Sequence, residues 1–511
     1  MSDKDFITMA PRGLTVLGLA AALTLPACGG GGGGGGGGPR DTTPPTASLN
    51  QTGPVLGKEA SVVVTFSEPM NTDSLQLGGA LEAAGTPTWS DDGTTLTLTP
   101  DDGAWPPGSG FDLSIDARDR AGNALATVRT VWLVKLEFNT FQPAALVIGQ
   151  ADFTGTGPNK GTNENIPDPP AADSLANPSG NPAVSPAGTL FISDSWNARV
   201  LGYHALPTVN NAAADFVLGQ PDFESKEEGV FPYPTGVSIA DGKMAVADSD
   251  GNRVLIYNTV PTSGGAEPDV IVGQTDLDSE DTTCDATHLQ YPEAAVLTAD
   301  GKLVVADSSH NRVLVWNALP TTHGQPADLV LGQPDFTRCG PDEGSQGGSV
   351  VHSARAFDFP AGLWTDGHRL ALTDNDNNRV LIWNTFPTSH FQPADIVLGQ
   401  ADFTSVTESV DTLDTPYGID SNGEQLAVAD SLNHRVLIWN SFPNSNAQQA
   451  DIVLGQSDLA HNQSNDDDQN GEDDGAASAR VLKSPDGVRF HQDKLLVSEI
   501  GNNRVLIFQS Q

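Results

Sequence analysis

Residues 248–257 read Asp-Ser-Asp-Gly-Asn-Arg-Val-Leu-Ile-Tyr, and this stretch decides the fold because its pattern recurs along the chain. Each copy has an acidic residue, an arginine five positions later and, after four more positions, an aromatic residue. The acidic residue and the arginine of the six copies are Asp194 and Arg199, Asp248 and Arg253, Asp307 and Arg312, Asp374 and Arg379, Asp430 and Arg435, and Glu499 and Arg504. Such regularity indicates a repeat architecture, in which one supersecondary unit is stacked on the next.

Every copy divides into four short strands, as the copy around residue 250 illustrates. A proline opens the first strand at 234–239, and apolar runs at 244–247 and 253–257 supply the second and the third. The fourth strand is the Val-Ile-Val-Gly run at 270–273. Continuous apolar runs are typical of sheets covered on both faces. Four-stranded units repeated around an axis predict an all-β fold, a six-bladed β-propeller whose blades bury their faces against each other.

The sixth copy ends after its third strand, at Phe508, and lacks a fourth. A matching fourth strand lies far upstream, because residues 142–153 repeat most positions of residues 392–403. We therefore expect residues 146–150 to pair with the last blade. Pairing of the first and last segments ties down both ends of the ring and removes an open sheet edge.

The repeated motifs resemble NHL repeats, whose blades carry Pro-x-Gly and Asp-x-x-x-x-Arg-Val. The resemblance spans residues 136–511 and implies a four-stranded sheet for each copy. This chain departs from the pattern at Ala294, where glycine is usual, at Glu499, which replaces Asp, and in its longer blades.

A smaller β-sandwich is predicted for residues 43–134. Residues 62–66 and 94–99 read as strands, with a turn at 91–93. The motifs at 64–70 and 119–125 resemble the bacterial Ig-like domain of secreted and surface proteins. That resemblance implies a spacer or adhesive module. Glu68 and Asp119 are also candidates for binding a cation, although turn-forming and solvated roles explain them as well.

The N-terminal residues 1–28 read as a signal peptide. An apolar run at 13–25 follows Arg12 and is too short to span a membrane comfortably. It ends in Leu-Pro-Ala-Cys, which resembles a bacterial lipobox and implies lipidation of Cys28. Because Gly29 is not Asp, the resemblance implies an outer-membrane lipoprotein, periplasmic or surface-exposed. A plain cleaved signal with an incidental cysteine is the alternative.

Composition narrows the possible partners. Residues 29–42 begin with an unbroken glycine run and predict a flexible linker. The net charge of −40 would repel a phosphate backbone, so we expect no nucleic-acid partner. We expect a monomer that meets the membrane through its lipid anchor and binds a protein or glycan ligand.

The recurring polar residues are predicted to be structural. A residue type that recurs in every blade most simply serves every blade, so each acid–arginine pair is expected to brace the turn between strands two and three. The glutamine of the Val/Leu-Gly-Gln motif is expected to make a hydrogen bond inside the blade. Five asparagines are predicted to form turns with left-handed backbone: Asn252, Asn311, Asn378, Asn433 and Asn503.

Function is expected where the repeat is broken, in long connections at one end of the blades. These connections are residues 154–176, 278–290, 337–358 and 460–483. The last contains a pattern that fits the start of a Ca²⁺-binding loop, with oxygen ligands at alternate positions and a glycine for the sharp turn. Its candidate ligands are Asp466, Asp468, Asn470, Glu472 and Asp474. The twelfth position is Ala477 instead of a bidentate Glu, and a solvated acidic loop is the alternative.

Three further sets of residues were weighed. Cys284 and Cys339 lie in consecutive connections and are expected to form a disulfide in an oxidising compartment, with two free thiols as the alternative. The histidines are scattered and predict no zinc site, which needs about three convergent ligands. Arg489 and Trp364 lie in first strands, where they either line the axial channel or pack ordinarily.

Two main functions follow from this reading. The first is a non-catalytic binding or scaffold protein at the cell surface, which contacts protein or glycan through the loop-rich end of the propeller. We expect no enzyme activity, because the sequence contains no nucleophile elbow, phosphate loop or zinc-protease motif. The alternative is a metal-dependent lyase or lactonase with its site at the axial channel, a resemblance at the level of the fold alone. A pure spacer without a ligand is a third possibility.

Overall fold

The computed structural model describes residues 41–161, 168–226, 229–342, 351–407 and 412–511. The predicted signal peptide, Cys28 and most of the predicted linker lie outside the described residues. The regular secondary structure of the described chain is almost entirely β-strand, as predicted, and none of its helices has the length and apolar character needed to cross a membrane. It divides into two compact units, the second of which is Val131–Gln511 together with two short segments, Gly53–Ala60 and Asp101–Phe111.

Residues 47–134 form two four-stranded sheets with strand orders β1-β3-β6-β5 and β2-β8-β7-β4. Their elements are β1 (Ala47–Leu49), β2 (Val55–Leu56), β3 (Val62–Phe66), β4 (Met70–Gly78), α1 (Ala80–Ala83), β5 (Gly85–Trp89), β6 (Thr95–Pro100), β7 (Gly108–Asp119) and β8 (Val128–Val134). In β3 and β6 buried and more exposed side chains alternate, as expected for strands that turn one face to a core. The predicted strand at 62–66 is confirmed, and the one predicted at 94–99 begins and ends one residue later.

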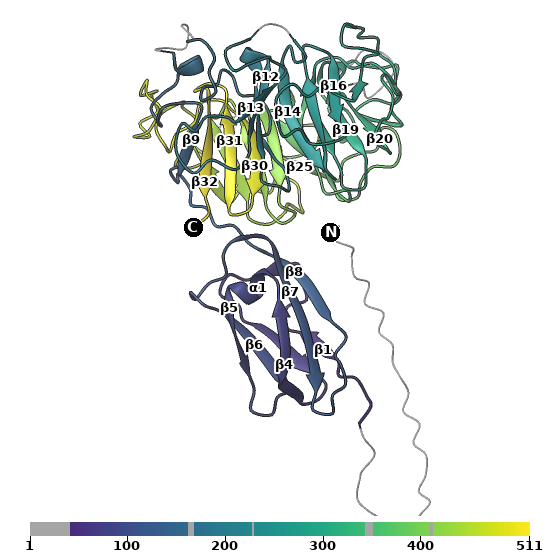
Figure 1. The fold of residues 1–511 in the computed structure, drawn as a ribbon. Helices are drawn as coiled ribbons and strands as arrows, with labels where there is room; N and C mark the ends of the chain where they lie inside the picture. The colour runs from purple at the N-terminus through teal and green to yellow at the C-terminus, as the bar shows by residue number, and fades with distance from the viewer. Residues whose placement is uncertain (1–40, 162–167, 227–228, 343–350, 408–411) are drawn as a thin grey trace, which may run out of the picture. The chain divides into compact units, whose positions relative to one another are not determined.

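Residues 146–511 form six four-stranded sheets in the described chain, numbered here from 1 to 6 (Figure 1). Sheets 1 to 3 are β10 (Ala183–Val184), β11 (Leu190–Asp194), β12 (Arg199–Tyr203) and β13 (Phe216–Leu218); β14 (Pro234–Ala240), β15 (Lys243–Asp248), β16 (Arg253–Tyr257) and β17 (Val270–Val272); and β18 (Pro292–Leu297), β19 (Leu303–Asp307), β20 (Arg312–Trp316) and β21 (Leu329–Leu331). Sheets 4 to 6 are β22 (Pro360–Thr365), β23 (Leu370–Asp374), β24 (Arg379–Trp383) and β25 (Ile396–Leu398); β26 (Pro416–Ser421), β27 (Leu426–Asp430), β28 (Arg435–Trp439) and β29 (Ile452–Leu454); and β30 (Pro485–His491), β31 (Lys494–Glu499), β32 (Arg504–Gln509) and β9 (Leu146–Ile148). Three single-turn 3₁₀ helices lie in the connections: η1 (Pro158–Lys160), η2 (Ser195–Asn197) and η3 (Ser308–His310).

The predicted pairing of the orphan segment with the last sheet is confirmed. Strand β9 is antiparallel to β32, with Ile148 opposite Val505 and Leu146 opposite Ile507. Figure 1 shows β9 at the edge of the sheet that contains β31 and β32, although most of the chain separates them in sequence. Sheet 6 is therefore assembled from both ends of residues 146–511.

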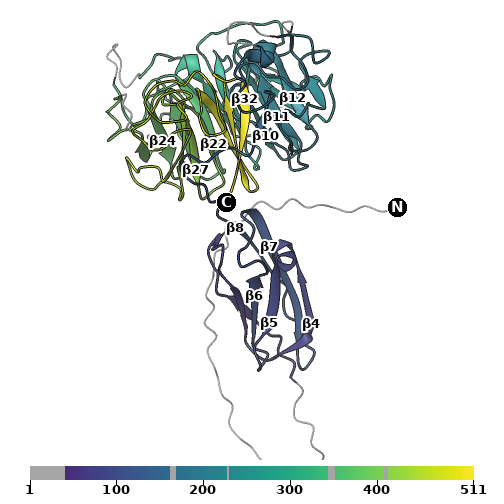
Figure 2. The same ribbon diagram turned by 90° about the vertical axis from the view of Figure 1, so that its left-hand side faces the viewer.

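The sheets are packed face to face through six clusters of buried apolar side chains. Each cluster draws residues from two sheets, and together they join sheets 1–2, 2–3, 3–4, 4–5, 5–6 and 6–1. In the last of these, Leu146 and Ile507 of sheet 6 pack with Leu190 and Leu201 of sheet 1. The second and third strands of every sheet are buried along most of their length because they are covered on both faces (Figure 2). Their apolar runs are explained by this double burial.

The residue directly before each repeat arginine adopts the left-handed backbone conformation. The five asparagines predicted as turn formers all lie in this turn, but one of them, Asn433, does not occupy the left-handed position. Asn252, Asn311, Asn378 and Asn503 have φ between 51° and 53°, as predicted. In the fifth copy the residue with φ 51° is His434, not Asn433. Asn433 instead donates its amide to the Asp430 carboxylate at 3.0 Å. Position relative to the arginine decides the conformation, and the asparagine preference was misleading here.

Candidate functional site

The repeated acid–arginine pairs are structural, and they do more than brace one turn. In sheet 3, Arg312 Nε lies 2.7 Å from Asp307 Oδ2, and both side chains are fully buried. The Arg312 guanidinium also donates to the carbonyl of His288 at 2.9 Å and to that of Phe336 at 2.8 Å. Those carbonyls belong to the connections that enter and leave the sheet. Each arginine therefore fixes two connections as well as its own turn.

Burial raises the pKa of five of these carboxylates: Asp194, Asp248, Asp374, Asp430 and Glu499. Burial raises the pKa of Asp248 to about 6, and the nearby charge of Arg253 acts in the opposite direction. Burial likewise raises the pKa of Asp430 to about 6 against the charge of Arg435. The arginine and a backbone N–H are the groups that hold each carboxylate, as between Gln290 N and Asp307 Oδ1 at 2.6 Å.

The recurring glutamines are also used inside the fold. Gln333 Nε2 donates to the carbonyl of Asn311 at 3.0 Å and to that of Gly340 at 2.7 Å. Gln274 and Gln400 make the same two kinds of bond. They hold the left-handed residue to the following connection.

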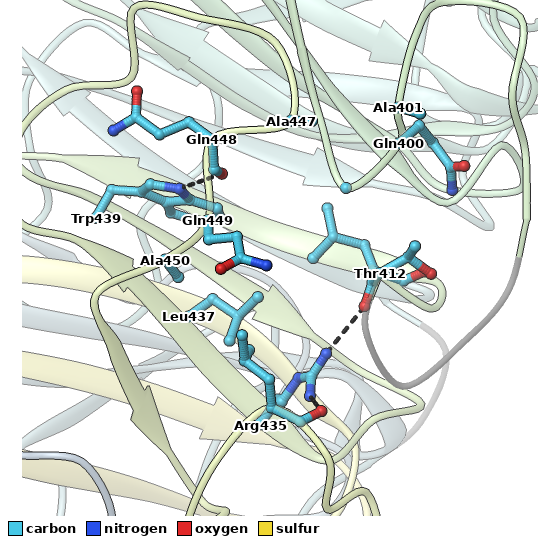
Figure 3. Close-up of a pocket in the computed structure, with 13 residues that line it drawn as sticks. Gln400, Ala401, Thr412, Arg435, Leu437, Trp439, Ala447, Gln448, Gln449 and Ala450 are labelled. Atoms are coloured by element: carbon cyan, nitrogen blue, oxygen red, sulfur yellow. Dashed lines mark hydrogen bonds between the residues drawn. The ribbon is translucent and has the colours of Figure 1, made fainter.

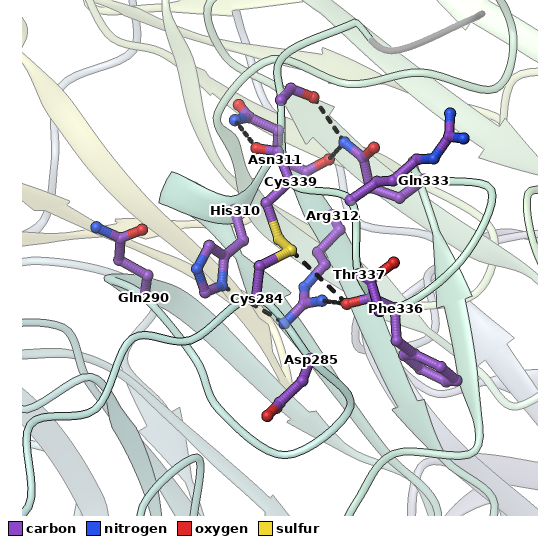
Figure 4. The surroundings of a disulfide bond; sticks show 12 residues. Cys284, Asp285, Gln290, His310, Asn311, Arg312, Gln333, Phe336, Thr337 and Cys339 are labelled. Carbon is purple, nitrogen blue, oxygen red and sulfur yellow. Dashed lines mark hydrogen bonds between the residues drawn. A yellow bond between two sulfur atoms is a disulfide. The ribbon is translucent and has the colours of Figure 1, made fainter. Parts of the chain in front are cut away.

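Cys284 and Cys339 are joined in a disulfide (Figure 4), with an S–S distance of 2.03 Å. The bridge links the connection before sheet 3 to the connection after it, and the Cys339 carbonyl accepts a hydrogen bond from Asn311 Nδ2 at 3.0 Å. Phe336, whose carbonyl binds Arg312, lies beside it in Figure 4. Sheet 3 thus carries a covalent link between its connections in addition to the hydrogen bonds of its arginine and glutamine.

The structure brings together three of the five residues predicted to bind Ca²⁺. Carboxylate oxygens of Asp466, Asp468 and Asp474 all lie within 4.8 Å of one another. The N–H of Gly471, whose φ is 89°, donates to Asp466 Oδ2 at 2.8 Å and closes the turn that the glycine predicts. Glu472 does not belong to this group of carboxylates, and the Asn470 side-chain oxygen accepts the N–H of Glu472 at 2.8 Å. The Ca²⁺ site stays a prediction.

A second acidic group lies in the smaller unit. Asp41 joins Glu68 and Asp119, with carboxylate oxygens within 4.8 Å of one another. Asn123 donates two hydrogen bonds to the Asp119 carboxylate, one from its backbone N–H at 2.8 Å and one from its side-chain amide at 2.7 Å. The turn-forming role weighed for Asp119 is therefore present, whereas its cation-binding role stays a prediction.

The histidines do not converge in the described part of the chain. Each of those in the connections contacts a carboxylate or backbone group nearby, as His310 Nδ1 does with Asp307 Oδ2 at 3.0 Å and His461 Nδ1 with Asp458 Oδ1 at 2.7 Å. None belongs to a described group of three clustered metal ligands.

Of the two residues weighed for the channel, Trp364 packs between sheets. Its ring belongs to the apolar cluster of sheets 4 and 5, and its Nε1 donates to the Ser421 carbonyl at 2.9 Å. Arg489 is 38 % exposed in its side chain and lies 3.2 Å from Asp420 Oδ1.

The strongest break in the repeat lies in the middle residue of Pro-x-Gly, at the start of each first strand. The register of the first and second strands shifts at this point in sheets 2 to 6, a distortion that re-aims side chains. The six middle residues all differ: Ser179, Thr235, Glu293, Ala361, Tyr417 and Asp486. Four of them are buried, and only Glu293 and Tyr417 are half-buried.

The glycines of this motif allow the first strands to approach closely. A Cβ on Gly180 would lie 1.3 Å from the carbonyl oxygen of Thr235 in the next sheet. A Cβ on Gly418 would lie 2.6 Å from the carbonyl oxygen of Asp486. The middle residues of different sheets are therefore crowded together, and glycine is required where the backbones meet.

Glu293 and Asp486 are the carboxylates of this region. Asp486 is 4 % exposed, and its Oδ1 accepts the Gly180 N–H at 2.5 Å and the Ser179 hydroxyl at 3.0 Å. Within the described chain, Asp486 Oδ2 and both Glu293 carboxylate oxygens have no hydrogen bond or ion pair. Burial raises the pKa of Asp486 to about 6. Burial, and then the charges of Asp486 and Asp250, raise the pKa of Glu293 to about 8.

Three tyrosines complete what we call the first-strand cluster: Tyr233, Tyr291, Glu293, Tyr417 and Asp486. The Tyr233 hydroxyl donates to Asn177 Oδ1 at 3.0 Å, and burial followed by the charge of Asp486 raises its pKa. Burial and the charge of Glu293 raise the pKa of Tyr291 to about 12. The same two causes raise the pKa of Tyr417. The backbones of neighbouring sheets approach one another in this region, since a Cβ on Gly236 would lie 3.8 Å from the carbonyl oxygen of Glu293.

Sequence reasoning missed this cluster, although a signal was present. Aligning the six motifs shows the middle position changing from Ser to Thr, Glu, Ala, Tyr and Asp, while the proline before it is the same in all six and the glycine after it is replaced only at Ala294. A position that varies inside an otherwise repeated motif is a candidate for function, and it was passed over in favour of the long connections.

A lateral crevice between sheets 4 and 5 is the weaker alternative (Figure 3). Its volume is about 240 Å³, and Leu413, Leu437 and Leu459 form apolar walls. The polar groups that reach it are already bonded: Arg435 donates to the Thr412 carbonyl at 2.9 Å and Trp439 to the Gln448 carbonyl at 2.9 Å. The crevice therefore offers shape but few unsatisfied polar groups.

Comparison with known proteins identifies one module. Residues 41–140 match the family model described as Bacterial Ig-like domain. No curated protein matches the sequence. Among solved structures, the chain is similar to virginiamycin B lyase from Staphylococcus aureus, with 11% identity over 85% of this chain and 98% of that one and a TM-score of 0.32.

Two other solved structures show comparable similarity. An aldose sugar dehydrogenase from Streptomyces coelicolor, in its PQQ-bound form, has 15% identity over 67% of this chain and 97% of that one, with a TM-score of 0.36. A putative 6-phosphogluconolactonase from Bacteroides fragilis has 13% identity over 71% and 90%, with a TM-score of 0.39. At such values these likenesses carry no argument about chemistry. The module identified in this chain is the bacterial Ig-like domain at residues 41–140.

Proposed function

We propose that residues 136–511 form a six-bladed β-propeller of the NHL type, closed by β9. Six four-stranded sheets and six apolar clusters, one for each pair of neighbours, support this reading. A closed ring needs one interface for every blade, and each sheet then buries both faces. An experimental structure with a different number of sheets around the axis would contradict it.

We further propose that the protein is a lipid-anchored binding or scaffold protein of the cell envelope. Its ligand, a protein or a glycan, would contact one end of the sheets, here named the loop end. The loop end carries the turns between second and third strands and the connections between sheets. Antiparallel pairing brings the first-strand cluster to this end, because Pro292 lies opposite Asp307 and Pro485 opposite Glu499.

The proposal rests on a difference in hydrogen bonding between the polar side chains that recur in every sheet and those that do not. The polar side chains that recur in every sheet are buried and bonded inside the fold. Glu293 and Tyr417 do not recur, and both reach the surface at the loop end. A rigid frame with variable residues at one end is the usual arrangement of a binding protein.

The test is binding of the purified chain to arrays of defined glycans and purified cell-surface proteins. We expect at least one ligand to be retained, and the double variant Glu293→Gln/Tyr417→Leu to lose it. The matched control is Asp241→Asn, which removes an exposed carboxylate from the turn between β14 and β15, at the opposite end. Equal binding by the double variant and the control would place the ligand elsewhere.

The anchor is proposed to be a diacylated Cys28, exposed at the outer membrane. Support comes from the lipobox-like sequence before it and from Gly29 after it. Labelling of cells with radioactive palmitate should mark the wild type but not Cys28→Ser, which should leave the membrane fraction. An unlabelled wild type would favour the plain signal peptide, and a labelled Cys28→Ser variant would favour another lipid attachment site.

One observation favours a second function, an enzyme at the axial channel. Glu293, with its pKa near 8, and Asp486, with its pKa near 6, have the separated proton affinities of an acid–base pair. The described cluster does not bring three metal-ligating atoms within 4.8 Å of one another, so this reading is favoured over the metal-dependent lyase or lactonase. Elemental analysis of the purified chain separates them: a stoichiometric transition metal lost in Glu293→Gln would restore the metal-dependent reading.

A further inference from the structure

We propose that the loop end binds a chain of neutral sugars along a row of four aromatic side chains. The four are Trp196, Tyr233, Tyr291 and Phe359, here named the aromatic arc. This inference deepens the proposed binding function and rests on it. It names the ligand class, a neutral oligosaccharide, and assigns it to the part of the loop end that sheets 1 to 4 provide.

The members of the aromatic arc lie at the loop end of four consecutive sheets. Tyr233, Tyr291 and Phe359 directly precede the prolines that open the first strands of sheets 2, 3 and 4. Trp196 lies in η2, the turn between the second and third strands of sheet 1, which is at the same end. Because sheets 1–2, 2–3 and 3–4 are packed as neighbours, the four residues follow one another around the loop end.

Hydrogen bonds connect the first two members of the arc. The N–H of Trp196 donates to the Ala176 carbonyl at 3.1 Å. The residue after Ala176 is Asn177, whose side-chain oxygen accepts the Tyr233 hydroxyl at 3.0 Å. The exposed tryptophan and the first tyrosine are therefore fixed to the same two residues of the connection before sheet 1.

The remaining members are connected in the same way. The Tyr233 carbonyl accepts the N–H of Ser249 at 2.9 Å, and Asn252 of the same turn accepts the Tyr291 N–H at 2.9 Å. The rings of Tyr291 and Phe359 contact each other directly, with centroids 6.3 Å apart and planes inclined by 43°. This geometry is that of a packed aromatic pair, so the two rings form one continuous apolar surface.

The backbone holds two of these rings in an uncommon conformation. Tyr291 has φ 53° and Phe359 has φ 49°, in the left-handed region that bulky side chains rarely adopt. The equivalent residue of sheet 1 is Asn177, with φ 54°, and asparagine is well suited to this region. Packing of the backbone therefore requires no aromatic residue at this position, and the rings need another explanation.

The arc is not used to pack the sheets. None of its members belongs to the six apolar clusters that join neighbouring sheets. Phe357, two residues before Phe359, is fully buried in one of them and shows what a packing aromatic does in this chain. Trp196 is 57 % exposed, and Tyr233 and Tyr291 are half-buried, as Phe359 is. These rings are therefore available to a ligand.

Polar side chains that can bond sugar hydroxyls directly precede two of the rings. Gln290 precedes Tyr291, and Asp358 precedes Phe359. Both polar side chains are half-buried, and neither makes a hydrogen bond among the described residues, as Figure 4 shows for Gln290. A hydroxyl donates and accepts, a carboxylate accepts, and an amide does both. Apolar rings with such neighbours match a pyranose, which has C–H faces and a rim of hydroxyls.

The charge of the chain favours neutral sugars. The net charge is −40, and Asp250 and Asp376 are exposed in the turns after β15 and β23, at the same end as the arc. An anionic glycan is repelled by this field. A basic protein is attracted, but that attraction falls as salt rises, whereas contact between rings and a neutral sugar does not depend on salt. Salt dependence therefore separates the two ligand classes.

The experiment is calorimetric titration of the full chain with neutral oligosaccharides of glucose, N-acetylglucosamine, mannose, galactose or xylose, each from monomer to hexamer. We expect one series to bind, with an affinity that rises with length until the arc is covered, then stays level, and is the same at low and high salt. A uronic-acid oligomer of equal length should not bind. If no neutral series binds, the arc proposal is wrong, whereas a protein retained on the arrays would leave the proposed function standing.

The variants use residues that the fold already accepts at equivalent places. Trp196→Ser introduces the residue that sheet 3 has at Ser309, and Phe359→Asn the one that sheet 1 has at Asn177, so both should fold, as unfolding profiles check. Each should weaken binding at least about tenfold, as loss of an aromatic anchor usually does. The matched control is Leu432→Ser, at the equivalent turn position of sheet 5, where the side chain is 50 % exposed; it should bind as the wild type. Unchanged affinity in both arc variants, or an equal loss in the control, overturns the arc.

Discussion

The repeat carboxylates and the first-strand carboxylates lie at the same end of the same sheets, yet they have opposite surroundings. Asp374 receives Arg379 Nε at 2.7 Å and the N–H of Asp358 at 2.8 Å, and it is fully buried. Glu293 has a raised pKa and no described partner for its carboxylate. The difference teaches that charge alone does not mark a site; a charge left without its counterpart does.

The largest expected effect comes from removing the charge of a repeat carboxylate that is paired with an arginine. Asp374→Asn should lower the free energy of unfolding by about 3–5 kcal/mol, because it leaves the Arg379 guanidinium buried without a counter-charge. Guanidinium chloride unfolding at pH 7 measures the change. Asp241→Asn, at an exposed turn, is the control and should change it by less than about 0.5 kcal/mol. A loss below about 1 kcal/mol for Asp374→Asn would mean that the remaining carbonyl contacts of Arg379 suffice.

The disulfide tests whether sheet 3 needs more than its arginine. Cys284→Ser/Cys339→Ser should cost about 2–4 kcal/mol, because the bridge closes a loop of 55 residues in the unfolded chain. The measurement is thermal unfolding with and without reductant. Reductant should lower the melting temperature of the wild type towards that of the double variant and leave the variant itself unchanged. Identical melting of the oxidised and reduced wild type would contradict a stabilising role.

Neutralising Glu293, a first-strand carboxylate without a described partner, should raise the free energy of unfolding instead of lowering it. The folded pKa of Glu293, about 8, exceeds its ordinary value of 4.5, so the folded chain holds an extra proton between these pH values and loses stability as pH rises through them. Glu293→Gln removes that loss. The variant should equal the wild type near pH 4 and become progressively more stable than it up to about pH 8. A series of unfolding curves across this range measures the difference, and a variant less stable at pH 9 would contradict the assignment.

The sequence predicted the parts of the molecule that depend on local pattern. Third strands begin at the repeat arginines, as at Arg253 and Arg435, because an apolar run after a turn has few alternatives. The pairing of residues 146–150 with the last sheet was predicted by counting strands, and residues 146–148 form the paired strand. Asn433 failed because a residue preference was used where the position before the arginine decides.

The candidate site could not be predicted from local patterns in the sequence, and the reason is physical. Glu293 and Asp486 are far apart in sequence and belong to different sheets, β18 of sheet 3 and β30 of sheet 6. Burial raises the pKa of both carboxylates, and the charge of Asp486 adds to the shift of Glu293, which no local pattern contains. A comparison of the six Pro-x-Gly motifs would have named the residues but not their burial.

The smallest expected effect concerns the acidic loop at residues 460–483. Its carboxylates are intermediate in character, because one is bonded inside the fold and another is exposed. Asp466 is fully buried and bonded to the N–H groups of Asn470 and Gly471, as repeat carboxylates are bonded, while Asp468 is exposed. If the three clustered carboxylates bind Ca²⁺ with a millimolar dissociation constant, as extracellular modules do, 10 mM Ca²⁺ should stabilise the fold by about 1.4 kcal/mol. Thermal unfolding with Ca²⁺ and with Mg²⁺ measures this, with Asp468→Asn as the test and Glu280→Gln, an exposed acid of another connection, as the control. Stabilisation that persists in Asp468→Asn would place the ion elsewhere, and none in the wild type would leave a loop whose carboxylates are satisfied by its own backbone.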